Sequence, residues 1–244
     1  MDLRDLPPID RDEMVGLATT EYERLVALLR TLAPDDWGRP TPCEGWTVQD
    51  IVAHLVGAAE ANASVPETLR QLIRGSRPAR RNGRPVVDGV NDVQIADRRH
   101  LTPEQLVDRL EAVAPRAIQG RRRTPRPLRR VPVPSPVDGK LTLGHLVDVV
   151  YTRDQWMHRV DLARATDREL TLTPDHDARI VADVAAEWAR CHGEPVTLEL
   201  TGPAGGHLVA GTGGPRLTLD AVDFCLAVSG RTTGEGLLAV PVVF

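Results

Sequence analysis

A carboxylate and an imidazole lie four residues apart in the segment RDQWMHRV, as Asp154 and His158. In a helix, such residues lie on the same face roughly 6 Å apart, so both side chains point to the same volume. Val147 and Val150 precede them at helical spacing and predict that this face is buried. A cation held between the two groups would remove the cost of burying an unpaired carboxylate. The pair therefore indicates a metal site, with a buried Asp–His hydrogen bond as the alternative.

A third candidate ligand, His54, lies in an earlier predicted helix. It follows Ile51 by nearly one turn and precedes Leu55, which places it at the edge of the apolar face. A lone helical histidine is more often an ordinary core or surface residue. Two imidazoles and one carboxylate from two facing helices would leave a fourth position open, as in catalytic zinc sites. The sequence thus predicts zinc, or another divalent ion, held by His54, Asp154 and His158.

Four segments with helical periodicity can position these ligands. They cover residues 14–32, 47–63, 102–118 and 142–164. Thr47 with Asp50 and Thr102 with Gln105 provide capping signals at the starts of two of them. Residues 74–90 are rich in arginine, proline and glycine and predict a connection before a short helical piece near 90–99. The proline-rich run 120–140 predicts a loop.

The pattern changes after Thr166. A helix is expected from Thr173, followed by short alternating strands and a last helix that Gly230 ends. The expected strands and last helix are 196–200 (VTLEL), 207–211 (HLVAG), 216–220 (RLTLD) and 221–229 (AVDFCLAVS). We therefore predict a mostly α protein, with a four-helix bundle in residues 1–165 and a small α/β domain in residues 166–244.

Composition limits the classes of function. The 244 residues carry a net charge of −4, so the molecule as a whole has no field that attracts nucleic acid or an anionic membrane. The sequence shows no secretory leader and no apolar run of roughly 20 residues, which predicts a cytoplasmic protein. Of its 30 basic residues only Lys140 is a lysine, a usage typical of high-GC bacteria.

Several other reactive residues have simpler interpretations. The arginine-rich segment 121–130 lacks interleaved aromatic residues, so a solvated loop is favoured over a nucleic-acid surface. Cys43 precedes the His54 helix and is expected to pack in its loop, although a regulatory thiol near the site stays open. The three cysteines show no CxxC spacing. Surface positions are expected for the remaining histidines, His100, His145, His176, His192 and His207.

Three segments carry a family resemblance. PTPCEGWTVQDIVAHL and RDQWMHRVDLARA resemble the two signature stretches of the mycothiol-dependent maleylpyruvate isomerase family, within the DinB-like four-helix-bundle superfamily. DAVDFCLAVSGR resembles the small carboxyl-terminal domain of that family. The resemblance implies that His54, Asp154 and His158 are the metal ligands. The founding pattern has Glu where this chain has Asp154. The shorter aspartate side chain would shift the metal, so the substrate and the reaction can differ from those of the founding enzyme.

The resemblance also implies a thiol co-substrate. Mycothiol, the low-molecular-weight thiol of actinobacteria, would present its sulfur to the metal, which favours the thiolate. Such a thiolate can add to an activated double bond, giving isomerisation after rotation and elimination, or it can remain attached, giving transfer. The resemblance further points to Arg231, after the last helix, as a thiol-binding residue; an ordinary helix-end arginine is the simpler alternative.

Two function classes follow. One is a metal-dependent thiol enzyme, a transferase or isomerase acting on a small electrophile, with a metal-dependent hydrolase on the same scaffold as its nearest alternative. The other is a non-catalytic bundle that binds a small molecule or a partner and in which the Asp–His pair is structural. Metal analysis separates the two classes. The sequence does not indicate an oligomeric state.

Overall fold

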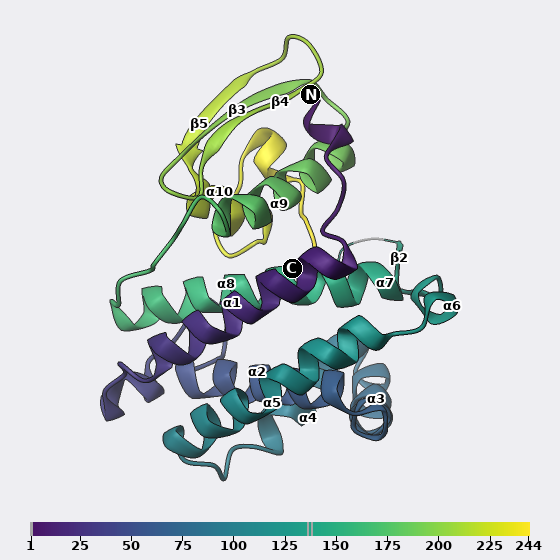
Figure 1. The fold of residues 1–244 in the computed structure, drawn as a ribbon, viewed down its shortest axis with the longest axis vertical. Coiled ribbons are helices and arrows are strands. Elements are labelled where there is room, and N and C mark those ends of the chain that lie inside the picture. The colour runs from purple at the N-terminus through teal and green to yellow at the C-terminus, as the bar shows by residue number, and fades with distance from the viewer. Residues whose placement is uncertain (1, 136, 138) are drawn as a thin grey trace.

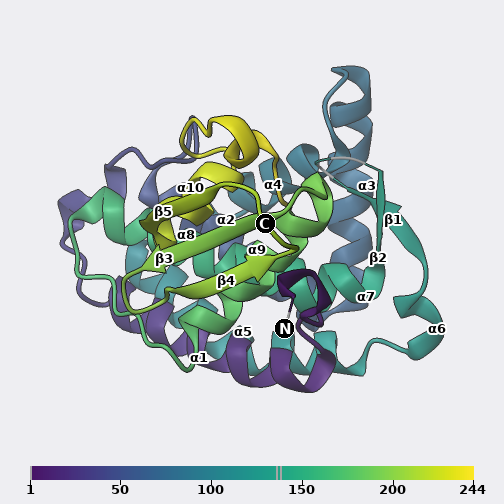
Figure 2. The ribbon, with the colours of Figure 1, turned by 90° about the horizontal axis from the view of Figure 1, so that it is seen from above.

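The computed structural model describes residues 2–135, 137 and 139–244 and consists of a helical body with a small α/β unit on one side (Figures 1 and 2). The helices of the body are Arg11–Leu29 (α1), Val48–Ala63 (α2), Val65–Arg81 (α3), Val86–Ala96 (α4), Pro103–Arg123 (α5), Arg126–Arg129 (α6), Leu143–His145 (α7) and Tyr151–Thr166 (α8). A π-helix, Leu146–Val150, joins α7 to α8. None of the described helices is long and apolar enough to cross a membrane.

Four helices, α1, α2, α5 and α8, pack against one another around an apolar core. Side chains on the predicted inner faces, among them Leu25, Val52, Leu110 and Met157, are buried. The predicted caps also form, because Thr47 and Thr102 each begin a helix in a capping box. The predicted fold class, mostly α with a four-helix bundle followed by a small α/β unit, is confirmed.

The prediction that residues 74–90 form only a connection is wrong, because part of this segment belongs to the helix α3. Residues 74–81 continue α3, which packs antiparallel to α4 beside α2. The buried residues of α3 are Gln71, Gly75 and Ala79, so its inner face has no large apolar side chain to show the helical period. The contact needs small residues, because a Cβ added to Gly75 would lie 2.5 Å from the carbonyl carbon of Gly89.

The predicted loop 120–140 is shorter than expected. The helix α5 continues through Gly120 to Arg123, and α6 follows at once. Two short strands, Pro132–Pro134 (β1) and Lys140–Thr142 (β2), then pair antiparallel. Positions 136 and 138 of the predicted loop lie outside the described residues. The predicted last helix of the bundle is present as α7, the π-helix and α8.

The α/β unit has the order expected from the sequence. Its elements are Asp177–His192 (α9), Val196–Thr201 (β3), Gly206–Ala210 (β4), Arg216–Asp220 (β5) and Ala221–Val228 (α10). The strand β3 is central, antiparallel to β4 and parallel to β5. The helix α9 lies between this sheet and the helical body in Figure 1.

Polar contacts join the two parts of the molecule. Arg153 of α8 is fully buried and pairs with Asp183 of α9 at 2.6 Å. The other carboxylate oxygen of Asp183 accepts from the backbone N–H of Ile9 at 3.0 Å. The segment before α1 thus contacts the α/β unit, although it precedes the bundle in sequence. The division after residue 165 stays a prediction.

Candidate metal centre

Three side chains from α2 and α8 converge inside the bundle. Nε2 of His54 lies 3.5 Å from Oδ2 of Asp154, and Nε2 of His158 lies 3.3 Å from Oδ1 of the same carboxylate. One donor atom from each residue falls within 4.8 Å of the other two. The structure therefore brings together the three residues that the sequence analysis selected.

The tautomer of His54 is set by a chain of amides that ends on the backbone. Gln71 Nε2 donates to the carbonyl oxygen of Gly57 at 3.0 Å, and Gln94 Nε2 donates to Gln71 Oε1 at 2.8 Å. Gln94 Oε1 is then left facing Nδ1 of His54 at 2.8 Å. Because a carbonyl only accepts hydrogen bonds, Nδ1 of His54 must donate and Nε2 carries the lone pair. That Nε2 is buried without a hydrogen-bond partner among the described residues.

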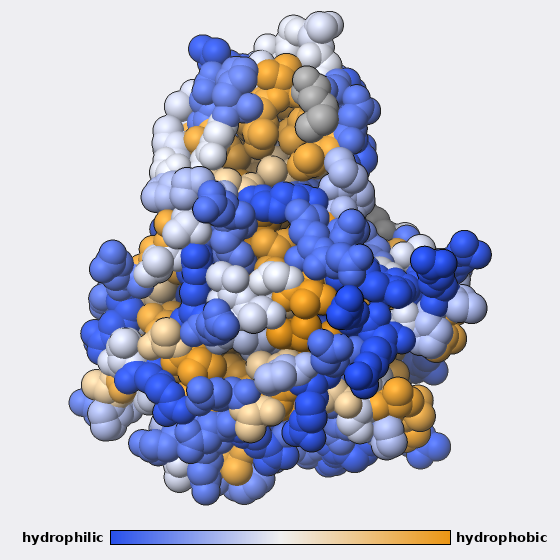
Figure 3. Space-filling view, viewed as in Figure 1, coloured by the Kyte–Doolittle hydropathy of each residue, from blue (hydrophilic) through white to orange (hydrophobic). Residues whose placement is uncertain are grey.

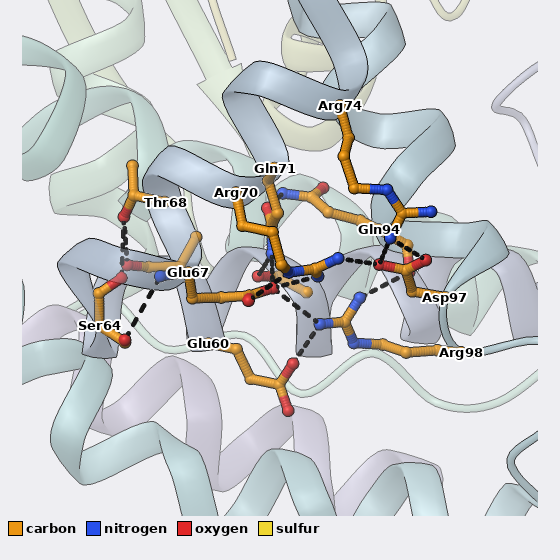
Figure 4. Close-up of polar contacts among 12 residues, drawn as sticks. Glu60, Ser64, Glu67, Thr68, Arg70, Gln71, Arg74, Gln94, Asp97 and Arg98 are labelled. Atoms are coloured by element: carbon orange, nitrogen blue, oxygen red, sulfur yellow. Dashed lines mark hydrogen bonds and ion pairs between the residues drawn. The ribbon is translucent and has the colours of Figure 1, made fainter.

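The hairpin of α3 and α4 holds this amide chain in place, as Figure 4 shows. Arg70 of α3 pairs with Asp97, next to the end of α4, at 2.7 Å. Arg98 is buried and pairs with Glu60 of α2, and it also donates to the carbonyl oxygen of Gln94 at 2.8 Å. Ion pairs on both sides of the hairpin thus fix the glutamines relative to the His54 helix.

A second chain of contacts orients His158. Its Nδ1 lies 3.1 Å from Oδ2 of Asp161, and Asp161 in turn receives hydrogen bonds from Nε of Arg231 at 2.8 and 3.0 Å. An ionised carboxylate only accepts, so Nδ1 of His158 donates to Asp161, and Nε2, which faces Asp154, is the nitrogen left for a metal. A histidine whose second nitrogen donates to a carboxylate or carbonyl is the usual arrangement of a metal ligand.

The electrostatics of the centre favour an ionised Asp154. Burial opposes the charge on Asp154, but the imidazoles of His158 and His54 outweigh burial and hold the pKa of this carboxyl below its usual range. Burial likewise opposes protonation of His158, but Asp154 and then Asp161 raise its pKa well above the usual value. Without a metal, a proton on Nε2 of His158 offsets the charge of Asp154. A divalent cation bound between Asp154 and the two imidazoles would replace that proton.

These residues fit a divalent cation. The two Nε2 atoms and a carboxylate oxygen lie within 4.8 Å of one another, and both Nδ1 atoms are already used as donors. The ring of Trp46 lies 5.2 Å from the ring of His54 and 6.1 Å from that of His158, so it covers one side. The Asp154 side chain is 23% exposed, against 8% for His54 and 5% for His158. The centre is therefore open to solvent on the Asp154 side.

The sequence analysis missed the residues that support the ligands. Asp161 follows His158 by three positions, a helical spacing that could have suggested the contact. Gln71 lies on a helix that the sequence pattern did not define, and Gln94 lies in the predicted helical piece near 90–99 without a spacing that points to His54. Trp46 lies in the loop before α2 and was not selected as a site residue.

Arg231 and Cys43 lie beside the centre. Arg231, predicted to bind a thiol, pairs with Asp161, and its Nη2 also lies 3.6 Å from the sulfur of Cys43. Cys43, expected to pack in its loop, lies 3.4 Å from Asp161 Oδ2 and 3.9 Å from Nδ1 of His158. Both residues therefore contact the groups that orient the His158 ring.

A second cluster of metal-type residues, Glu21, His176 and Asp177, has its charge balanced already. Arg159 donates to both carboxylates, and Arg24 pairs with Asp177 at 2.6 Å. The two guanidinium groups leave no uncompensated negative charge for a cation. The cluster also corrects the expectation that His176 is a surface residue: it is buried against Glu21, because the start of α9 packs on α1.

The fold and the cluster define a helical-bundle protein with a buried site of two histidines and one carboxylate. Residues 18–163 match the family model described as the mycothiol maleylpyruvate isomerase N-terminal domain. The chain belongs to this family, as its signature segments indicated.

Solved structures and curated relatives extend the comparison. A crystal structure of the mycothiol-dependent maleylpyruvate isomerase has a TM-score of 0.59 and 20% identity, over 97% of this chain and 94% of that one. A mutant of that enzyme has a TM-score of 0.59 and 19% identity, over 96% and 93% of the two chains. Rv0738, an uncharacterized protein of Mycobacterium tuberculosis, is 42% identical over 38 residues, 16% of this chain and 21% of its own length. This match spans about a fifth of the relative's length.

Proposed function

We propose that this protein is a divalent-metal-dependent enzyme that uses a low-molecular-weight thiol, of the mycothiol class, to isomerise a small electrophile or to transfer the thiol to it. Zinc is the proposed metal, and His54, Asp154 and His158 are its proposed ligands. Family membership supports the mycothiol-linked isomerase chemistry, and the solved structures similar in fold carry that activity in their names.

One observation carries the proposal. The Nε2 atoms of His54 and His158 face the single carboxylate of Asp154, while both Nδ1 atoms donate to Gln94 and Asp161. A merely structural Asp–His pair needs only one imidazole and would leave the buried Nε2 of His54 unsatisfied. Two imidazoles and a carboxylate also leave room for a further ligand, as catalytic zinc sites do.

The chemistry follows from the open side of the centre. A divalent cation there would favour the thiolate form of a thiol, whose ordinary pKa of about 8.5 leaves it mostly protonated at pH 7. Trp46 shields the histidine side, so a thiol and an electrophile would approach past Asp154. Addition of the thiolate to an activated cis double bond, rotation and elimination would give the trans isomer; capture without elimination would give transfer.

Arg231 is proposed to contact the thiol or its polar groups. Its Nε and Nη2 atoms are used by Asp161 and Cys43, whereas Nη1 makes no hydrogen bond with the residues that the structure describes. A guanidinium held on one edge and free on the other can receive a carbonyl or hydroxyl group without moving.

The proposal is tested by metal analysis followed by turnover. The purified protein should retain about one zinc ion per chain, and the zinc-loaded protein with mycothiol should convert a panel of small electrophiles. Absorbance would detect isomerised products and mass spectrometry would detect thioethers. Absence of a bound ion after zinc loading would favour the non-catalytic module, and thiol-independent hydrolysis products would favour the hydrolase.

A further inference from the structure

A basic cavity lies away from the metal centre, where α5 ends and α1 begins. Its volume is about 980 Å³. We call it the basic cavity. It is lined by Asp10, Arg11, Asp12, Gln119, Arg122, Arg123, Arg126, Arg129, Arg130 and Asp148. Strongly hydrophilic residues gather in Figure 3 on the side where Figure 1 places α6 and the end of α5. None of the lining residues belongs to the metal centre or its supporting contacts.

The three carboxylates of the basic cavity are largely occupied. Asp148 is buried and pairs with Arg129. Asp10 caps α1, because its side chain accepts the backbone N–H groups of Asp12 and Glu13 at 2.9 Å. Asp12 lies 3.7 Å from Arg122. The negative charges therefore do not cancel the whole set of six guanidinium groups.

Three of the six guanidinium groups make no polar contact within the described part of the chain. Arg123, Arg126 and Arg130 make no side-chain hydrogen bond or ion pair with any of the residues 2–135, 137 and 139–244. All three are exposed and line the same cavity. The three carboxylates of the cavity offset their mutual repulsion only in part, and an anion bound among them would offset it further.

From this arrangement we infer that the basic cavity binds a compact polyanion of the oligophosphate class. Guanidinium groups present paired N–H donors that match phosphate oxygens, and several of them can bind successive phosphates of one molecule. The volume is within the range of small-molecule sites. A single-stranded nucleic acid is disfavoured, because no lining residue is aromatic and none can stack on a base.

Calorimetric titration of the full-length, zinc-loaded protein with sodium tripolyphosphate tests this inference. The site variant is Arg123→Gln/Arg126→Gln/Arg130→Gln. The matched control, Arg77→Gln/Arg80→Gln/Arg81→Gln, removes the same charge from exposed residues of α3 that line no part of the cavity. Titrations are run at about 0.15 M salt so that unspecific attraction is screened. The single variant Arg126→Gln is measured in parallel, in case the triple variant fails to fold.

One equivalent of tripolyphosphate should bind the unmodified protein and the α3 control alike. The site variant should bind at least about tenfold more weakly, because each lost guanidinium removes a charge-assisted contact. Arg126→Gln should give a smaller loss in the same direction. No binding up to about 1 mM, or equal losses in both triple variants, would overturn the inference. Citrate that binds as tightly as tripolyphosphate would show that the site is not specific for phosphate. A single-stranded oligonucleotide that binds more tightly than tripolyphosphate and displaces it would indicate a nucleic-acid surface instead.

Discussion

His54 and Gln94, 40 positions apart, are joined by a contact of 2.8 Å between Nδ1 and Oε1. This contact fixes which nitrogen of His54 faces the bundle interior, and it depends on α4 lying close against α2. Gly57 permits that approach, because a Cβ at this position would lie 2.6 Å from the Cβ of Gln94. The orientation of the proposed metal ligand is thus determined by packing between helices.

Removing either imidazole should remove the metal without unfolding the bundle. His54→Ala and His158→Ala are each expected to retain much less than one zinc ion per chain and to lose thiol-dependent turnover, since the apolar core is made by other residues. Metal content after desalting and circular dichroism measure both effects. His100→Ala, an exposed position, is the control and should retain its metal. Full metal content in both variants would contradict the proposed ligand set.

Replacing Gln94 should weaken the site indirectly. In Gln94→Leu, His54 loses the acceptor that holds its ring, and loss of such a supporting contact typically costs about 10–100-fold in metal affinity. Competition with a chromogenic chelator measures the affinity. Gln119→Leu, an exposed change of the same kind on α5, should leave it unchanged. Equal affinities in the unmodified protein and Gln94→Leu would show that the contact does not orient the ligand.

Gly57→Ala should destabilise the protein. The added methyl group would meet Gln94 and the Arg98 guanidinium, at 2.6 and 2.9 Å, so α4 must shift at an expected cost of about 1–3 kcal/mol in the free energy of unfolding. Gly16→Ala on α1 is the matched control, because nothing lies within 4 Å of its added Cβ. The control should be stabilised by about 0.5–1 kcal/mol, as expected for alanine in a helix. Chemical denaturation measures the free energy of unfolding of both variants and shows whether the two changes have opposite signs.

Glu187 should contribute to stability against acid. Burial raises its pKa, but His145 and Arg153 outweigh burial and lower the value from 4.5 to about 2. A lowered pKa in the folded state means that the stabilisation is present above pH 4.5 and is lost as pH falls toward about 2. Glu187→Gln should therefore weaken the dependence of the free energy of unfolding on pH within this window. Glu169→Gln, at an exposed residue, is the control.

The helices with large apolar side chains were predictable from the sequence. Their inner faces repeat leucine and valine at the helical period, and the caps at Thr47 and Thr102 mark where two of them begin. The contact of Asp154 with His158 was equally accessible, because an i, i+4 spacing brings two side chains together in any regular helix. The helix α3 was not predictable in full, because its buried face is made of Gln71, Gly75 and Ala79.

By itself, the sequence determined which residues could act as ligands and that two of them share a helix face. The tertiary structure decided that His54 meets that face from a second helix, that Gln94 orients the His54 ring, and that Arg231 pairs with Asp161 beside His158. The physical reason is the distance along the chain over which each kind of interaction acts. Periodicity and capping act over a few residues along one helix, whereas these contacts join positions 40 to 100 residues apart and form only after the helices have packed.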